Sequence, residues 1–224
     1  MNAKQAAGYK AAEWVQEGML VGLGTGSTAY YVIERIGQRV AEGLKIQAIA
    51  TSKASEELAE KYRIPLIKAA DVSKLDLAID GADEVDPALA LIKGGGGALL
   101  REKLVAINSD KFIVIADPGN LVPHVGAVKL PIEIVPFCYE WTLVQLKSRY
   151  DIEFQMRTRD GGLYVTDNGN YIVDASFGVI KDPGTLDAEL KQLTGVVDHG
   201  LFVNIADVVV IGHEDGTTEM IEKP

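Results

Sequence analysis

The feature that most constrains the fold of this chain is a short apolar run that passes directly into a glycine-rich turn. Residues 19–23 read Met-Leu-Val-Gly-Leu, the turn spans Gly22 to Thr28, and a helical pattern follows from about Ala29 to Val40. A strand that ends in such a turn and opens a helix points backbone N–H groups at an anion. The pattern predicts a strand–turn–helix unit that binds an anion. The alternative is a tight turn in which Ser and Thr only cap the helix.

This turn departs from the nucleotide-binding motifs nearest to it. Gly22-x-Gly24-x-x-Ser27 lacks the third glycine of the dinucleotide fingerprint, and the next predicted strand, 46–50, ends in Thr51-Ser52 instead of an acidic residue. Both differences argue against a dinucleotide. No Gly-Lys-Ser/Thr sequence follows, so the turn is not a nucleotide P-loop. The hydroxyl groups of the turn suit a single phosphate group.

Strands and helices alternate through the first half of the chain. The patterns predict helices at 3–17, 53–62 (capped by Ser52) and 98–108, and further strands at 65–68, 75–79 and 111–116. Alternation of this kind implies a mainly parallel sheet that is covered on both faces. We therefore expect an α/β fold for this part of the chain.

The pattern changes near residue 128. Predicted strands at 129–135, 152–157, 163–166, 171–175 and 196–203 are interrupted by helices at 137–148 and 186–193, with an Asn168-Gly169 hairpin turn. This order suggests a split βαβ, ferredoxin-like α+β domain. The last segments, 207–211 and 219–221, are expected to form a hairpin that returns to the first sheet. The predicted domains are therefore 1–127 plus 204–224, and 128–203.

Composition and charge exclude several classes of protein. The chain has 224 residues, with 22 Lys and Arg against 32 Asp and Glu, a net charge of −10 and one cysteine. An acidic chain lacks the general basic surface that nucleic acid or an anionic membrane attracts, so neither is expected as a partner. A single cysteine forms no intrachain disulfide, and we see neither a signal-peptide pattern nor a membrane-spanning apolar run. We expect a cytoplasmic protein.

The segment Asp80-Gly81-Ala82-Asp83-Glu84 follows a predicted apolar strand. Ligands of open α/β sheets bind beyond the carboxyl ends of the strands. Two carboxylates three residues apart can bind sugar hydroxyls there or transfer protons, and a metal site is also conceivable. The alternative is a turn in which the aspartates only cap backbone N–H groups.

Four consecutive glycines, Gly94 to Gly97, follow Lys93 and precede a predicted helix. Ordering four glycines costs conformational entropy, which close approach of the backbone to a ligand would justify. Lys93 would bring a positive charge to an oxyanion. The alternative is a flexible connection.

Glu102 lies in the helix after these glycines, on the same face as Ala98 and Ala106. It could face a cleft or water, because Arg101-Glu102-Lys103 is also typical of a solvated run of charges. The spacing alone does not select Glu102 as a functional residue.

Other common catalytic arrangements are absent from the sequence. The three histidines show no ligand spacing, Cys138 has no neighbouring Cys or His, and there is no G-x-S-x-G segment. A structural zinc site and a Cys–His nucleophile are therefore not expected, and metal ligands are not predicted.

Taken together, five segments in this order resemble ribose-5-phosphate isomerase of type A, along the whole chain. They are Val21–Thr28, Asp80–Glu84, Ile92–Gly96, Arg101–Lys103 and Val165–Asn170. The resemblance implies interconversion of D-ribose 5-phosphate and D-ribulose 5-phosphate in the non-oxidative pentose phosphate pathway, without an organic cofactor or catalytic metal. It also implies a Rossmann-like main domain, a smaller ferredoxin-like domain, and self-association as a homodimer or homotetramer.

The resemblance also assigns roles to residues. Glu102 matches the general base of the family, and Asp80 and Lys93 match catalytic groups. The matching substrate-binding residues are Lys4, Thr25, Gly26, Ser27, Thr28, Gly81, Ala82, Asp83, Gly94, Gly95 and Gly96. One departure concerns Asn120, which stands where the family usually has a substrate-binding lysine. Asparagine brings no charge, so the phosphate site is expected to depend on other groups.

Competing functions remain open from the sequence alone. Another sugar-phosphate isomerase, a sugar-phosphate deaminase or a CoA transferase could share the fold, although no glutamyl nucleophile is marked for CoA transfer. A sugar-phosphate sensor without catalytic activity is a further alternative, but it would not need Glu102 or Lys93.

Overall fold

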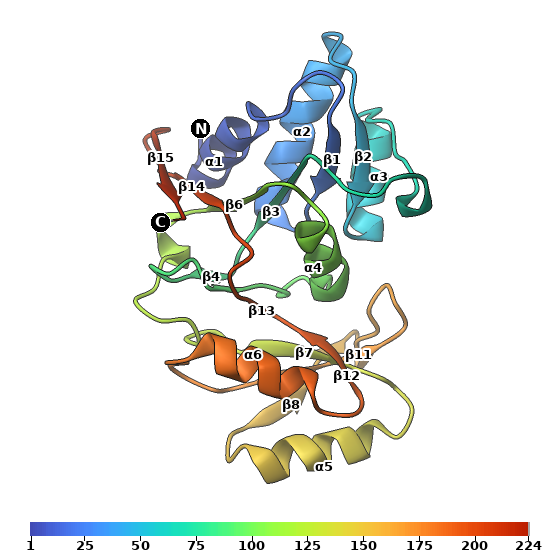
Figure 1. Ribbon diagram of the computed structural model, residues 1–224, viewed down its shortest axis with the longest axis vertical. Helices are drawn as coiled ribbons and strands as arrows, with labels where there is room; N and C mark the ends of the chain where they lie inside the picture. The colour runs from blue at the N-terminus through green and yellow to red at the C-terminus, as the bar shows by residue number, and fades with distance from the viewer. Residues whose placement is uncertain (224) are drawn as a thin grey trace. The chain divides into compact units, whose positions relative to one another are not determined.

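The computed structural model describes residues 1–223 and divides into two compact units (Figure 1). The first unit comprises Met1–Ala82, Arg101–Leu121 and the chain from Ile205 onward, and the second comprises Asp83–Leu100 and Val122–Asn204. The domain boundaries predicted from the sequence stay a prediction, because compactness alone does not define an independently folding domain.

The first unit is built on a six-stranded sheet in the order β15-β14-β6-β3-β1-β2. All neighbouring strands are parallel except the hairpin of β14 and β15. The strands are β1 (Leu20–Leu23), β2 (Gln47–Ala50), β3 (Leu77–Gly81), β6 (Phe112–Ala116), β14 (Val208–Gly212) and β15 (Thr218–Glu222). The mainly parallel sheet is confirmed, as is the return of the C-terminal hairpin to it.

Successive side chains of a strand point to opposite faces of the sheet, and different helices pack on each face. One set of side chains, which includes Val21, Leu23 and Ile79, packs in one core with residues of α1 (Ala3–Ala12), α2 (Ser27–Ala41) and α3 (Lys53–Lys61). On the other face, a Cβ at Gly22 would collide with Val105 of α4 (Leu99–Ile107). Gly22 therefore allows α4 to lie directly against β1. Two 3₁₀ turns, η1 (Ala69–Asp71) and η2 (Pro118–Asn120), complete the unit.

Two sequence predictions in this unit are wrong. The first helix ends at Ala12 instead of residue 17, because the N–H groups of Glu13, Trp14 and Val15 bond to carbonyls three residues back and tighten the chain. The predicted strand at 65–68 is reduced to a single bridge between Leu66 and Ala48. Pro65 has no N–H to extend that ladder.

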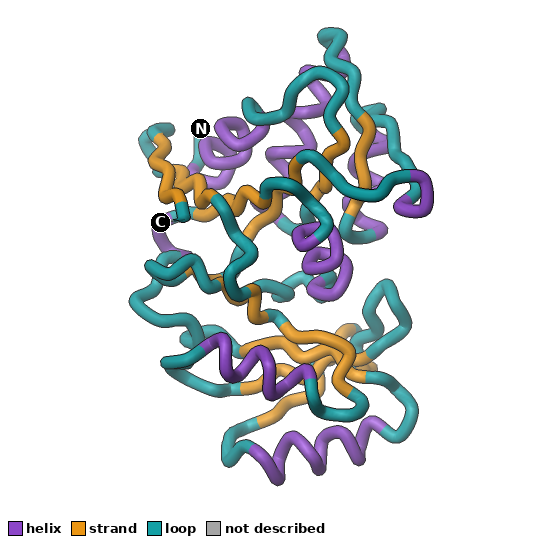
Figure 2. Tube along the Cα trace, in the orientation of Figure 1, coloured by secondary structure: helices purple, strands orange, loops and turns teal. Residues whose placement is uncertain are grey.

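The second unit contains a four-stranded antiparallel sheet in the order β12-β7-β11-β8. The chain order is β7 (Leu130–Ile134), α5 (Tyr139–Arg149), β8 (Phe154–Met156), β11 (Tyr171–Ala175), α6 (Pro183–Lys191) and β12 (Val196–His199), as the ribbon and tube show (Figures 1 and 2). This is the split βαβ order of a ferredoxin-like fold. Leu146 of α5 and Leu190 of α6 share a core with Ile132 of β7, so both helices cover one face of the sheet.

The predicted strand at 196–203 divides in two. After β12, the segment β13 (Leu201–Phe202) pairs with β5 (Leu91–Ile92), which pairs in turn with β4 (Glu84–Val85). Gly200 separates β12 from β13, since a Cβ there would collide with the carbonyl oxygen of Lys93. A short hairpin, β9 (Thr158–Arg159) with β10 (Gly162–Leu163), precedes the Asn168-Gly169 turn, where Gly169 has φ +82°.

Candidate active site

Asp80 lies near the carboxyl end of β3 and is 3% exposed. Its Oδ1 accepts the N–H groups of Thr25 at 3.0 Å and Gly81 at 2.7 Å. A Cβ at Gly24 would collide with this carboxylate, so glycine at this position allows β1 and β3 to bring Asp80 against the turn. Asp80 is therefore held in a fixed position beside the predicted anion-binding loop.

The glycine-rich turn leaves the N-terminus of α2 without a side-chain cap. Gly26 is the N-cap residue with φ +100°, a conformation that favours glycine, and Gly26 and Ser27 are exposed. The first N–H groups of a helix lack intrahelical partners, and they carry the positive end of the helix dipole. This end of α2 is suited to a phosphate group.

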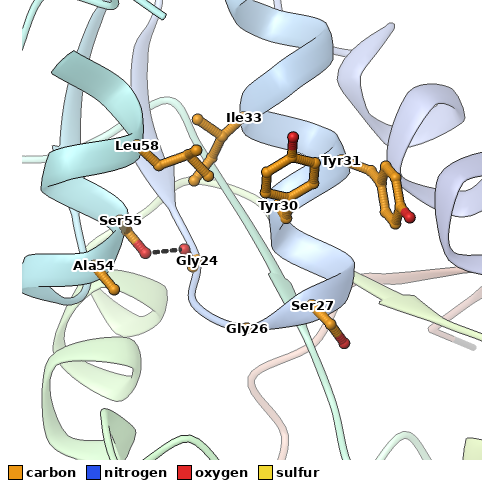
Figure 3. Close-up of a pocket in the computed structure, with 9 residues that line it drawn as sticks. All are labelled: Gly24, Gly26, Ser27, Tyr30, Tyr31, Ile33, Ala54, Ser55 and Leu58. Atoms are coloured by element: carbon orange, nitrogen blue, oxygen red, sulfur yellow. Dashed lines mark hydrogen bonds between the residues drawn. The ribbon is translucent and has the colours of Figure 1, made fainter. Parts of the chain in front are cut away.

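Thr25 is oriented into the fold by a cluster of hydroxyl groups. Its Oγ1 lies 2.7 Å from the Thr51 Oγ1, 2.8 Å from the Ser52 Oγ and 3.1 Å from the Ser55 Oγ. The Ser55 hydroxyl also donates to the Gly24 carbonyl at 2.6 Å, as the dashed line in Figure 3 shows. The side chain of Thr25 therefore anchors the loop. Ser52 also caps α3 as predicted, but the sequence reasoning missed the shared role of these hydroxyls.

Lys4 reaches the same loop from α1. Its Nζ donates to the Ser27 Oγ at 2.9 Å, across 23 positions of sequence. The structure thus places a cation beside the 24–28 loop, and the phosphate-side role of Lys4 stays a prediction. Asn120 instead forms a capping box, in which its Oδ1 accepts the Asp117 N–H at 2.9 Å and the Asp117 Oδ1 accepts the Gly119 N–H at 2.8 Å.

A pocket of about 530 Å³ opens beside the loop, between α2 and α3 (Figure 3). Its lining consists of Gly24, Gly26, Ser27, Tyr30, Tyr31, Ile33, Ala54, Ser55 and Leu58. Near it, the Tyr62 hydroxyl lies 3.2 Å from that of Tyr30 and donates to Glu34 at 3.1 Å. The hydrogen bond with Tyr30, followed by burial and Glu34, raises the pKa of Tyr62 above its ordinary value.

In the second unit, the glycine loop (residues 94–97) is fastened by Asp83, whose Oδ2 accepts the Gly95 N–H at 2.9 Å. Gly94 and Gly97 have φ of +99° and +83°, so both positions favour glycine. Gly95 and Gly96 are exposed. The glycine loop is thus bonded to Asp83 while Gly95 and Gly96 stay exposed, and close approach of its backbone to a ligand remains a prediction.

Lys93 precedes the glycine loop and is only 2% exposed. Its N–H donates to the Gly200 carbonyl at 2.9 Å, and its Nζ lies 5.4 Å from the centre of the Phe202 ring. A lysine is almost never so deeply buried unless it is paired. The catalytic role that the resemblance implies for Lys93 stays a prediction.

Glu102 is 4% exposed on α4, and the small residues that share its face, Ala98 and Ala106, are buried with it. Leu104 and Ile107, on the other side of the helix, are 50% and 55% exposed. The interpretation of residues 101–103 as a solvated run of charges is therefore wrong for Glu102. Leu104 and Ile107 therefore face outward on this helix, whereas the carboxylate faces inward.

The predicted residues are divided between the two units. Lys4, Thr25, Gly26, Ser27, Thr28, Asp80, Gly81, Ala82 and Glu102 belong to the first, and Asp83, Lys93, Gly94, Gly95 and Gly96 belong to the second. Within the first unit the structure brings Asp80 and Lys4 to the 24–28 loop. Within the second it brings Asp83 to the glycine loop.

The described residues contain neither a cluster of metal ligands nor a membrane-spanning helix. Among residues 1–223, no three His, Cys, Asp or Glu side chains are grouped so that they could hold a metal ion. Within the same residues, none of the helices has the length and apolar character needed to cross a membrane.

An α/β fold that combines an exposed glycine-rich loop at the start of a helix with buried acidic and basic side chains is typical of the class of enzymes that act on small phosphorylated substrates. Residues 47–216 match the family described as ribose 5-phosphate isomerase A (phosphoriboisomerase A). The chain belongs to this family.

Curated relatives and solved structures of this family match the chain along nearly its full length. A ribose-5-phosphate isomerase A of Bacillus mycoides is 50% identical over 98% of this chain and 99% of its own, and one of Listeria monocytogenes is 44% identical over the whole of both chains. The solved ribose 5-phosphate isomerase of Plasmodium falciparum superimposes with a TM-score of 0.95, 44% identity and 98% and 97% coverage. A D-ribose-5-phosphate isomerase in complex with phospho-erythronic acid superimposes with a TM-score of 0.94, 36% identity and 99% and 100% coverage.

Proposed function

We propose that this chain interconverts D-ribose 5-phosphate and D-ribulose 5-phosphate, as an aldose–ketose isomerase of the non-oxidative pentose phosphate pathway. The observation that carries the proposal is the burial of Glu102 on α4, where the apolar side chains of Leu104 and Ile107 are exposed. Burial of a carboxylate is costly, so such an arrangement calls for a function. The names of the relatives support the same reaction.

The reaction moves a proton from C2 to C1 of the open-chain sugar through an enediolate. We assign Glu102 as the general base that removes and returns this proton. Lys93 and the N–H groups of the glycine loop would stabilise the charge that develops on the enediolate oxygen. Asp80 is assigned to the proton transfer that opens the furanose ring. Asp83 would then bind substrate hydroxyls.

Phosphate binding is assigned to the first unit. The uncapped N-terminus of α2 supplies N–H groups, the Ser27 and Thr28 hydroxyls supply hydrogen bonds, and Lys4 supplies charge. Because Asn120 brings no charge at the position where the family has lysine, Lys4 is expected to carry more of the electrostatic attraction.

Replacement of Lys4 by methionine tests this assignment. A hydrogen bond to a charged group contributes about 1.5–3 kcal/mol, so the KM for ribose 5-phosphate is expected to rise about tenfold or more. Turnover should change little, since Lys4 is not assigned to the reacting carbons. Steady-state kinetics at low ionic strength measure both constants. An unchanged KM would contradict the role of Lys4.

We propose that the chain self-associates as a homodimer or homotetramer in the cytoplasm. Phe137, Trp141 and Val144 lie at helical spacing on and just before α5 and are 83%, 70% and 64% exposed. Three exposed apolar side chains of this size within eight residues of chain support an interface.

Light scattering is expected to give the particle mass of a dimer or a tetramer of the 24.1 kDa chain. Replacement of Trp141 by glutamate should lower that mass if α5 lies in the interface, with exposed Met220→Glu as a matched control on β15. A monomeric native chain would contradict self-association.

Incubation of the chain with ribose 5-phosphate, followed by NMR, tests the function directly. Signals of ribulose 5-phosphate should appear without added metal. Faster conversion of a different sugar phosphate would favour another isomerase, and binding without conversion would favour a sensor.

A further inference from the structure

The carbonyl groups of the glycine loop are held by a guanidinium group that the assigned mechanism does not use. Arg157 follows β8, and its Nη1 donates to the Gly94 carbonyl at 2.9 Å and to the Gly95 carbonyl at 3.2 Å. The Tyr164 hydroxyl lies 3.4 Å from the Gly96 carbonyl, and a Cβ at Gly97 would collide with the Tyr164 ring. Three successive carbonyls of the loop therefore contact side chains of the second unit.

Because each peptide unit is planar, these carbonyl contacts also determine the directions in which the neighbouring N–H groups point. In a trans peptide, the carbonyl of one residue and the N–H of the next point to opposite sides. Fixing the Gly94 carbonyl on Arg157 therefore turns the Gly95 N–H the other way, where Asp83 accepts it at 2.9 Å. Fixing the Gly95 carbonyl on Arg157 likewise turns the exposed Gly96 N–H away from Arg157.

Arg157 is itself fixed by a bidentate ion pair. Its Nε and Nη2 donate to the two carboxylate oxygens of Asp174 on β11 at 3.0 and 2.5 Å. The two side chains are only 17% and 18% exposed. Arginine is suited to this position, because its planar fork can bond a carboxylate on one side and carbonyl oxygens on another.

The segment 164–170 adds a second support. Glu133 of β7 is fully buried, and its Oε1 accepts hydrogen bonds from Thr166 at 2.9 Å, Asn168 at 3.2 Å and Asn170 at 2.9 Å. This cluster fastens the turn to the sheet and so fixes Tyr164, which begins the segment. The Thr166–Asn170 motif therefore has a structural role, which is to hold this turn on the sheet.

We propose that Arg157 is a positioning residue for the isomerisation: it presets the glycine loop so that its N–H groups meet the developing enediolate oxygen. The inference rests on the proposed function. Preorganised donors act mainly on the transition state, because they need no rearrangement when charge develops. Loss of Arg157 should therefore reduce turnover more than substrate binding.

The test compares Arg157→Ala and Arg157→Lys with the native chain, and Arg149→Ala is the matched control. Arg149 also forms an ion pair in the second unit, with Glu189 at 3.3 Å, but it lies on α5. Steady-state kinetics give kcat and KM for ribose 5-phosphate. Phospho-erythronic acid carries a carboxylate, which resembles the charge of an enediolate, so its inhibition constant serves as a second measure of the N–H donors of the loop. Guanidinium chloride at low millimolar concentration tests rescue of Arg157→Ala.

The proposal expects Arg157→Ala to lower kcat about tenfold or more, while KM changes less than about threefold. Inhibition by phospho-erythronic acid should weaken by a similar factor, and guanidinium should restore part of kcat. Arg157→Lys, which keeps charge but loses the fork, should also lose kcat. Arg149→Ala should behave as the native chain, with or without guanidinium.

Unchanged kcat in Arg157→Lys and Arg157→Ala would overturn the proposal, and so would an equal loss in Arg149→Ala or a loss confined to KM. Should Arg157→Ala not fold, Arg157→Lys carries the comparison. An inactive native chain would overturn the proposed function and this inference with it, whereas an active native chain with active Arg157 variants overturns the inference alone.

Discussion

Glu102→Gln is expected to reduce turnover of ribose 5-phosphate by about 10²–10⁴-fold, because an amide of nearly the same shape cannot take up a proton. Glu102 is 4% exposed on α4, and glutamine preserves its volume and part of its hydrogen bonding. The substitution should therefore remove the base without disturbing the helix. Coupled steady-state kinetics measure the loss.

Two further measurements separate a lost base from a lost site. Calorimetric titration should show that Glu102→Gln still binds ribose 5-phosphate with an affinity close to that of the native chain. Glu102→Asp keeps the carboxylate but moves it by one methylene, so it should retain more turnover than glutamine does. Near-native turnover in Glu102→Gln would overturn the assignment of the base.

Lys93→Met is expected to lower kcat by about 10²–10³-fold, the range seen when one donor to an oxyanion is removed. Methionine keeps an unbranched side chain that can still pack against the Phe202 ring, from whose centre the Lys93 Nζ lies 5.4 Å. The loss should be in kcat and less in KM, because the enediolate charge exists only after substrate has bound.

Lys111→Met is a matched control for this variant. The Nζ of Lys111 lies 4.5 Å from the centre of the Trp14 ring, so the control also removes a lysine over an aromatic ring, but outside the assigned site. Its kcat should equal that of the native chain within about twofold. A kcat for Lys93→Met as high as that of the control would contradict the role of Lys93.

Much of the fold could be predicted because its elements have strong local patterns. Apolar runs at 19–23 and 111–116 became central parallel strands, and the Asn168-Gly169 dipeptide became a turn with the expected positive φ. The strand predicted at 65–68 failed because Pro65, within the run itself, has no N–H to extend the ladder beyond a single bridge. The break at Gly200, by contrast, depends on contacts with distant residues, Lys93 and Pro131, that a local pattern does not contain.

The candidate site was less accessible from the sequence. The spacing places Glu102 on one face with Ala98 and Ala106 but does not decide whether that face is buried, and the structure shows Glu102 buried while Leu104 and Ile107 are exposed. Only the resemblance to a family selected Glu102. Arg157 was missed for a different reason, because its contacts with Gly94 and Gly95 join segments more than sixty residues apart.

The acidic charge balance of the chain restricts how a phosphate group can be attracted. A chain with a net charge of −10 must attract a phosphate through local groups. The candidate groups for phosphate attraction are the N-terminus of α2, Ser27 and Lys4, whose Nζ donates to the Ser27 Oγ at 2.9 Å.

The most direct test of the account is the reaction of ribose 5-phosphate with the native chain in D₂O, followed by NMR over many turnovers. Proton transfer by a carboxylate through an enediolate predicts that ribulose 5-phosphate forms and that deuterium enters C1 of the ketose and C2 of the aldose. Conversion without any deuterium at these carbons would indicate a hydride shift and contradict the account, as would the absence of conversion.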